Sequence, residues 1–204
     1  RRDAEVIYPP VNTDSFPFLS QKEDFYVTVS RLVSYKQVTL IVKAFNQLKK
    51  PLVVIGTGND MDKILKIAKP NIQILGWQPE DMVKKYMANA RGFVYAACED
   101  FGIALVEAQA CGTPVIAYGA GGALETVRDI RKYGDTGTGI FFQKQTEASL
   151  IEAVETFEAN REKISYEYAS LHAAQFSRQM FASRYLNIVH TCEEKLIQGK
   201  EKFD

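Results

Sequence analysis

The sequence is poor in the residues that build metal sites and disulfide frameworks. Its 204 residues include two histidines and three cysteines, which are Cys98, Cys111 and Cys192. No pair among them has the spacing of zinc ligands, and an odd number of cysteines leaves at least one without a disulfide partner. We therefore expect reduced thiols, a cytoplasmic location and no bound metal.

An excess of charge of one sign and a long apolar run are also missing. Lysine plus arginine and aspartate plus glutamate each number 25, so the net charge is zero. A nucleic-acid-binding surface normally has a basic excess, so we expect no nucleic-acid partner. No run approaches the roughly 20 apolar residues of a membrane-spanning helix, and no signal-peptide pattern opens the chain. We expect any membrane contact to come from another part of the protein, with the protein peripheral at the membrane.

The glycine-rich loops are incomplete as nucleotide fingerprints. The loops "GTGNDM" (56–61) and "GAGGAL" (119–124) have Met61 and Leu124 where the dinucleotide motif G-x-G-x-x-G requires its last glycine. The phosphate-binding motif G-x-x-x-x-G-K-[ST] does not occur. These loops do not favour NAD, FAD or a P-loop, and tight turns explain their glycines equally well.

Six short apolar segments alternate with helix-like segments along the chain. Most of the apolar segments show no polar alternation, which is typical of strands covered on both faces. This order predicts an α/β fold with a doubly wound, parallel, six-stranded Rossmann-like sheet. The expected strands are residues 25–30, 52–56, 72–76, 92–97, 114–119 and 139–143, and the expected helices between them include 38–50, 80–90 and 122–133.

The two ends of the chain differ from this pattern. Residues 6–16, "VIYPPVNTDSF", contain two prolines and polar turn residues, which is typical of a linker. No strand is expected after Thr146, so the fold ends in a helical carboxyl-terminal tail. We assign residues 1–20 to a linker, 21–175 to the Rossmann-like domain and 176–204 to the closing tail. Because the chain does not begin with methionine, we expect it to be part of a longer protein.

Charged and glycine-bearing loops follow the expected strands. Arg31 and Lys36 follow the first, "GTGN" the second, "GWQPED" the third, "CEDFG" the fourth and "GAGGALE" the fifth. Ligands of doubly wound sheets bind outside the carboxyl ends of the strands, so these loops should meet at one edge. Two cations beside a helix that begins near Gly102 suit a diphosphate, although ordinary surface charges would give the same pattern. Trp77, in the third loop, is either a packing residue or a cleft aromatic, and we expect it to pack against the protein.

A glutamate inside an apolar helix is the clearest sign of a ligand. In "EDFGIALVEAQACGTP" (99–114), Glu107 shares one helical stripe with Ile103, Val106 and Ala110. A carboxylate among apolar neighbours is costly unless something pairs with it. Either Glu107 pairs with a lysine or arginine of the protein or sits at the rim of the core, or it faces the cleft and binds the vicinal hydroxyls of a ligand such as a ribose. Carboxylates bind ribose in this way in dinucleotide folds.

These segments resemble the family-four retaining glycosyltransferases, which consist of two Rossmann-like domains (the GT-B fold). "EDFGIALVEAQACGTPVIAYGAGGALETV" resembles the family signature, with its two glutamates eight positions apart at Glu99 and Glu107. "VSRLVSYKQVTLIVKAF" resembles the phosphate-binding segment, with Arg31 and Lys36 at the matching places. "VIYPPVNTDSF" resembles the interdomain linker and "FSRQMFASRYLNIV" the closing helix. The resemblance covers the carboxyl-terminal, donor-binding half of such an enzyme, so the tail is expected to pack on an amino-terminal domain.

The resemblance implies a role for each site residue. Arg31 and Lys36 hold the diphosphate of a sugar nucleotide, Glu99 faces the transferred sugar, and Glu107 binds the ribose hydroxyls. The remaining substrate-binding residues lie near the sugar or phosphate (Phe101, Gly102 and Ile103) and near the base (Gly76, Trp77 and Gln78). No metal cofactor is needed, because the two cations and the helix terminus stabilise the leaving diphosphate.

The resemblance also suggests substrates. "EDFGI" departs from the commoner "EGFGLP" of the family and is similar to a branch that uses GDP-mannose. The expected donor is therefore GDP-mannose, and the expected acceptor is a glycan or a lipid-linked molecule. The acceptor contacts should come mainly from the amino-terminal half.

Two other functions are open at this point. A sugar-nucleotide epimerase has a similar fold, but its elimination chemistry uses acids and histidines, and His172 and His190 both lie in the expected helical end of the chain. A binding module would recognise nucleotides without turning them over. Consumption of a nucleotide sugar by the full-length protein would separate an enzyme from a binding module.

Overall fold

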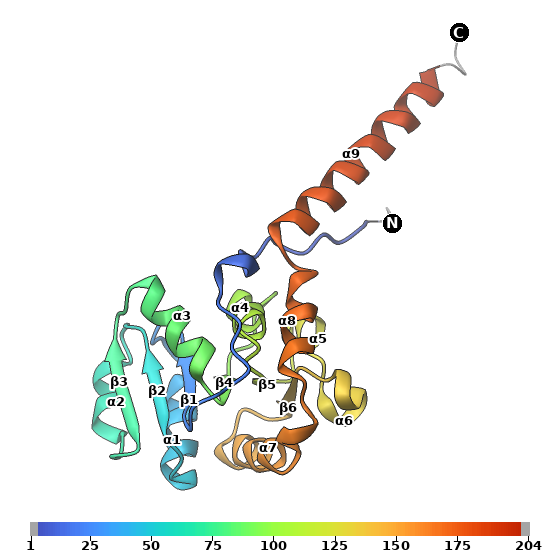
Figure 1. Cartoon of the computed structure of the whole chain (residues 1–204). Coiled ribbons are helices and arrows are strands. Elements are labelled where there is room, and N and C mark those ends of the chain that lie inside the picture. The colour runs from blue at the N-terminus through green and yellow to red at the C-terminus, as the bar shows by residue number, and fades with distance from the viewer. Residues whose placement is uncertain (1–3, 201–204) are drawn as a thin grey trace.

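The computed structural model describes the backbone of residues 4–200 and the side chains of residues 4–194. Its centre is a sheet of parallel strands in the order β3-β2-β1-β4-β5-β6 (Figure 1). The strand order reverses between β1 and β4. The predicted doubly wound sheet is confirmed, and all the expected strands are present: β1 (Tyr26–Val29), β2 (Leu52–Ile55), β3 (Ile72–Gly76), β4 (Gly92–Tyr95), β5 (Val115–Tyr118) and β6 (Gly139–Phe142).

Alternate residues of each strand contact different helical layers. Leu52 and Val54 of β2 share a core with side chains of α1, α2 and α7, whereas Val53 and Ile55 share a core with side chains of α3 and α4. Both faces of the sheet are therefore covered, which is why the strand segments show no polar alternation. The helices of the two layers are α1 (Val38–Leu48), α2 (Met61–Ile67), α7 (Glu147–Asn160), α3 (Glu80–Asn89) and α4 (Ile103–Ala110), with α8 (Tyr166–Ala174) packed on α4.

The single helix expected over 122–133 is wrong in its extent. The carboxylate of Asp129 accepts a hydrogen bond from the Phe141 N–H at 2.9 Å, and Arg131 donates to the Phe141 carbonyl at 2.8 Å. These bonds satisfy backbone groups of the edge strand β6, which protects the edge from pairing with another chain. The extended backbone that they require separates two single-turn helices, α5 (Ala123–Thr126) and α6 (Ile130–Tyr133).

The segment before β1 and the segment after α8 meet beside α4. The Val11 N–H donates to the Phe176 carbonyl at 2.9 Å, and both side chains lie with Phe101 in one apolar cluster. From there α9 (Arg178–Lys200) extends away from the sheet (Figure 1). The helical tail is thus confirmed, whereas its packing on a further domain and the boundaries at residues 20 and 175 stay predictions. Residues 1–3 of the assigned linker and 201–204 of the tail lie outside the described residues.

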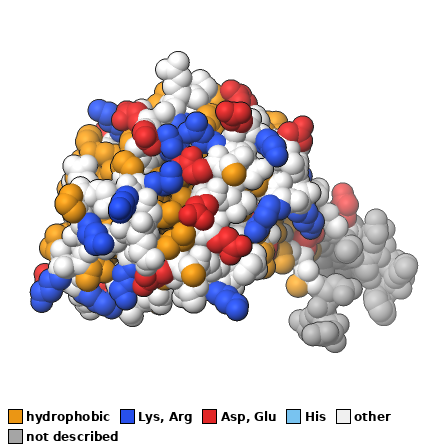
Figure 2. All heavy atoms as spheres, turned by 90° about the horizontal axis from the view of Figure 1, so that it is seen from below, with side chains coloured by type: hydrophobic (Ala, Val, Ile, Leu, Met, Phe, Trp, Pro, Cys, Tyr) orange, Lys and Arg blue, Asp and Glu red, His pale blue; other side chains and the backbone are white. Residues whose placement is uncertain are grey.

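On the face that points downward in Figure 1, positive and negative charges are not segregated. Basic and acidic side chains are interspersed there (Figure 2), as the equal totals of the sequence lead one to expect. Between residues 4 and 200, no helix combines the length and the apolar character needed to cross a membrane. Short 3₁₀ helices complete the secondary structure at Thr13–Ser15, Ser34–Lys36, Gly134–Thr136 and Arg161–Lys163.

Candidate functional site

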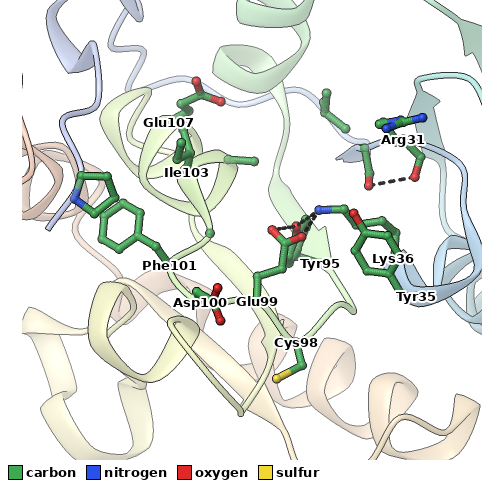
Figure 3. A pocket seen from close by; sticks show the side chains of 15 residues that line it. Arg31, Tyr35, Lys36, Tyr95, Cys98, Glu99, Asp100, Phe101, Ile103 and Glu107 are labelled. Atoms are coloured by element: carbon green, nitrogen blue, oxygen red, sulfur yellow. Dashed lines mark hydrogen bonds and ion pairs between the residues drawn. The ribbon is translucent and has the colours of Figure 1, made fainter.

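A cavity of about 700 Å³ lies at the carboxyl ends of β1 and β4, where the strand order reverses. Doubly wound sheets bind their ligands at such a reversal. The segment after β1 forms one side of the cavity, and the loop after β4 with the first turns of α4 forms the other (Figure 3). The structure brings together here most of the predicted site residues, which are Arg31, Lys36, Glu99, Phe101, Gly102, Ile103 and Glu107.

Lys36, Tyr95 and Glu99 form a closed polar cluster on the cavity wall (Figure 3). The Lys36 ammonium makes a salt bridge with Glu99 Oε1 and donates to the Tyr95 hydroxyl at 2.9 Å. The Tyr95 hydroxyl donates to Glu99 Oε2 at 2.6 Å. Burial alone would raise the pKa of Glu99, but the hydrogen bonds from Lys36 and Tyr95 outweigh it and lower that pKa. Glu99 is therefore an ionised carboxylate at neutral pH.

Arg31 is a cation that the protein leaves available to a ligand. It lies two residues after the end of β1 and is exposed, and no acidic side chain in the described part of the chain forms a salt bridge with it. The 3₁₀ turn at Ser34–Lys36 then directs Lys36 back to the same cavity. Arg31 and Lys36 thus come from one segment and face one space, as the strand-end argument predicted.

The first turn of α4 lines the same cavity. Gly102, the residue before the helix, has a φ of 84°, a left-handed conformation that glycine adopts without strain. The first N–H groups of a helix have no partner within it and carry a partial positive charge, so this end attracts anions. The Phe101 ring stacks on Tyr8 and packs edge-on against Phe176, with ring centroids 5.6 Å away in both cases. The ring therefore anchors the loop to the segment before β1 and to the segment after α8.

Glu107 projects from the second turn of α4 and lines the cavity (Figure 3). It is half-buried rather than buried, and it makes no salt bridge with any described residue. Burial and then the negative charge of Glu80 raise the pKa of Glu107, while Lys84 opposes them. Lys84 itself pairs with Glu80 at 2.7 Å. The described residues thus supply no salt-bridge partner for Glu107, and a ligand as its partner stays a prediction.

A second cavity of about 400 Å³ adjoins the first. Residues 29–31 line both cavities. Trp77 and Gln78 line the second cavity together with residues 56–58, and Gly76 precedes them at the end of β3. Trp77 is 72% exposed, so the expectation that it packs against the protein is wrong. The residues predicted to lie near a base thus do not line the first cavity. Trp77 and Gln78 line the second cavity, which shares residues 29–31 with the first.

Two tyrosines line the main cavity although no sequence motif marks them. Tyr35 is 59% exposed, and its ring centroid lies 5.2 Å from Lys36 Nζ. Tyr95 is the last residue of β4 and is buried. A phenol that ends a strand at the ligand-binding edge of a sheet is the only signal that could have identified Tyr95.

The histidines lie elsewhere, as expected. His172 on α8 lies 3.2 Å from the Thr126 carbonyl, and His190 is exposed on α9, so neither lines the cavity. Within the described residues, no three histidine, cysteine, aspartate or glutamate side chains are grouped as metal ligands.

The family of the chain follows from its match over residues 12–170 to the family model "Glycosyl transferases group 1". The chain belongs to this family. The matched range contains every predicted site residue on both sides of the cavity. The resemblance of the motifs around Arg31 and Glu107 to glycosyltransferases is thereby confirmed at the level of the family.

Two curated relatives illustrate the breadth of the family. The chain is 28% identical over 199 residues to a probable sucrose-phosphate synthase of Thermosipho melanesiensis, covering 90% of this chain and 44% of that protein. It is 36% identical over 115 residues to the GDP-mannose-dependent monoacylated alpha-(1-6)-phosphatidylinositol monomannoside mannosyltransferase of Corynebacterium glutamicum, covering 48% of this chain and 30% of that protein. The chain thus spans less than half the length of these relatives.

The fold is also that of solved glycosyltransferase-like structures. Anabaena Alr3699/HepE in complex with UDP-glucose superposes with a TM-score of 0.74 and 19% identity, covering 92% of this chain and 57% of that one. At this identity the likeness establishes the shared fold alone.

Proposed function

We propose that the chain is the donor-binding half of a retaining glycosyltransferase, which moves a sugar from a nucleoside diphosphate to an acceptor. The observation that supports this most directly is the cavity at the strand-order reversal. There Arg31, which has no salt bridge among the described residues, lies across from the α4 terminus and the carboxylates of Glu99 and Glu107. The arginine and the helix amides suit a diphosphate. The carboxylates suit the hydroxyls of a ribose and of a transferred sugar.

The chemistry of transfer needs a stabilised leaving group. As the bond between the sugar and the diphosphate breaks, negative charge develops on the diphosphate oxygens, and donors already aimed at them lower the barrier. We assign this role to Arg31, to Lys36 and to the first amides of α4. The proposal therefore requires no metal cofactor. Glu99, which is ionised, would hold sugar hydroxyls at the other end of the donor.

For the donor we propose GDP-mannose. The "EDFGI" motif and the similarity to a GDP-mannose-dependent mannosyltransferase support this choice. The alternative is a UDP-hexose, because a protein of the same fold was solved with UDP-glucose. We further propose that the acceptor is a glycan or lipid-linked molecule held mainly by an amino-terminal half, and that the protein acts in the cytoplasm, peripheral at the membrane.

Calorimetric titration of the 204-residue chain with GDP, UDP and ADP tests the proposal. We expect one diphosphate to bind at least about tenfold more tightly than the others, and to bind more tightly than its nucleoside by a similar factor. We expect the isolated chain to transfer no sugar, because half of the cleft is missing. The absence of binding by all three diphosphates would contradict the proposed function, and transfer by the isolated chain at the full protein's rate would contradict the two-domain interpretation.

A further inference from the structure

The Tyr95 hydroxyl occupies a position that the proposed function does not explain. It lies between the two opposite charges of the cavity wall, 2.9 Å from Lys36 Nζ and 2.6 Å from Glu99 Oε2. The ring is 4% exposed and stacks on Phe93 with centroids 6.1 Å apart. The hydroxyl is therefore held in place by buried packing rather than by the two charged groups that it contacts.

The directions of these hydrogen bonds follow from the chemistry of the three groups. A lysine ammonium is only a donor, and an ionised carboxylate is only an acceptor. The single proton of the phenol must therefore point to Glu99, and its oxygen must accept from Lys36. Each of the three groups is thus a hydrogen-bond partner of the other two.

A bound diphosphate changes this balance. Its oxygens compete with Glu99 for the Lys36 ammonium, and they bring more negative charge than one carboxylate does. A partly buried carboxylate that loses its only partner becomes costly. Glu99 has a second partner in Tyr95, which is the buried last residue of β4 and belongs to a different segment from Lys36.

We propose that Tyr95 is a positioning residue, which keeps the Glu99 carboxylate ionised and aimed into the cavity when a diphosphate takes Lys36 away. The inference rests on the proposed function, since it concerns the sugar end of the same site. If Tyr95 has this role, it strengthens the binding of the sugar part of the donor and leaves the binding of the nucleoside diphosphate part unchanged. Lys36 then exchanges one anionic partner for another without leaving Glu99 unsatisfied.

Tyr95→Phe tests this directly, because it removes the hydroxyl and keeps the buried ring. The measured quantity is the ratio of the dissociation constant of a diphosphate to that of its sugar nucleotide, taken for GDP with GDP-mannose and for UDP with UDP-glucose. In Tyr95→Phe we expect this ratio to fall by about tenfold, the usual effect of one hydrogen bond to a charged group. The affinity for the diphosphate alone should stay within about twofold of the wild type.

Two further variants make the result specific. Tyr118→Phe removes a hydroxyl from the last residue of the neighbouring strand β5, outside the cavity, and should leave the ratio unchanged. In a Glu99→Gln background, Tyr95→Phe should lower the ratio little further, because the two groups act as one unit. Melting curves of each variant in the empty state establish that it is folded.

Each outcome bears on one idea. A wild-type ratio in Tyr95→Phe, with diphosphate binding intact, overturns the inference and leaves the proposed function standing. An equal loss in the Glu99→Gln background also overturns it, since Tyr95 would then act by another route. If the wild-type chain binds neither diphosphate, the proposed function fails first, and the inference fails with it.

Discussion

The backbone N–H of Gly122 donates to the carbonyl of Glu99 at 2.7 Å, which joins the loop after β5 to the loop after β4. A Cβ atom at position 122 would lie 2.3 Å from Phe101 Cα and 2.5 Å from the Asp100 carbonyl oxygen. The glycine loop "GAGG" (119–122) therefore packs its backbone closely against the backbone of residues 99–101, the loop that carries Glu99. This explains why an incomplete dinucleotide fingerprint stands beside the cavity.

Gly122→Ala should disrupt the cavity. The added methyl group meets backbone atoms, which cannot shift cheaply, so we expect a loss of about 2 kcal/mol or more in the free energy of unfolding and weaker diphosphate binding. Gly134→Ala is the control for backbone strain alone, since nothing lies within 4 Å of its Cβ but its φ of 55° and ψ of −127° disfavour a side chain. We expect that control to cost about 1–3 kcal/mol in the free energy of unfolding and to bind the diphosphate normally. Urea denaturation and calorimetry measure both variants, and normal diphosphate binding by Gly122→Ala would refute the supporting role of Gly122.

Arg31→Ala should weaken binding through charge. Hydrogen bonds to charged groups are worth about 1.5–3 kcal/mol, so the affinity for a nucleoside diphosphate should fall by roughly one to two orders of magnitude. The free nucleoside, which lacks the phosphates, should be affected much less. Lys66→Ala, an exposed cation on α2, is the control for a general loss of positive charge. Titrations that show the same loss for nucleoside and diphosphate would remove Arg31 from the phosphate site.

Most of the fold and most of the site were predictable, for one physical reason. Continuous apolar segments fix buried strands, and their order fixes where the strand ends meet, so the strand pattern alone places Arg31 and Glu99 in one cleft. Side-chain pairing was not predictable. Lys36 binds Glu99 through a bond between segments 63 residues apart, and no local pattern encodes such a partner. The exposure of Trp77 and the break at Asp129 likewise depend on tertiary contacts rather than on propensity.

Acid sensitivity should depend on Glu158. Burial would raise its pKa, but hydrogen bonds from Tyr26, Lys50 and Arg91 outweigh that and hold the pKa at about 2, against an ordinary value of 4.5. A depressed folded-state pKa gives stability that is present above about pH 4.5 and is lost as the pH falls toward 2.

Glu158→Gln should remove this dependence. We expect the variant to lose about 1–3 kcal/mol in the free energy of unfolding at pH 7 and distinctly less at pH 3, where part of the stabilisation by Glu158 is already lost. Glu155→Gln, exposed on the same helix, should follow the wild type at every pH. Urea denaturation at pH 7, 4.5 and 3 measures the three proteins. If the difference in the free energy of unfolding between Glu158→Gln and the wild type is the same at all three pH values, this account is wrong.

The melting temperature of Glu107→Gln without ligand should show whether Glu107 serves a ligand or stabilises the fold. Its pKa is raised by burial and by Glu80, so the folded state disfavours the charged form. That penalty is absent below the ordinary pKa, grows as the pH rises from there to the folded-state pKa, and is constant above it. Glu107→Gln removes the charge and keeps the shape, so the empty variant should melt at the wild-type temperature near pH 4.5 and at the same or a higher temperature at pH 7.

Although Glu107→Gln should not lower the melting temperature of the protein without ligand, it should weaken ligand binding. We expect Glu107→Gln to bind the preferred nucleoside diphosphate more weakly and to lose its preference for ribose over 2′-deoxyribose, because the carboxylate would accept from the ribose hydroxyls. Glu167→Gln, exposed on α8, should keep both the affinity and the preference. Had Glu107 a buried lysine or arginine partner, breaking the pair would cost about 3–5 kcal/mol. A large drop in the melting temperature of the empty variant, with ribose discrimination intact, would therefore return Glu107 to the scaffold.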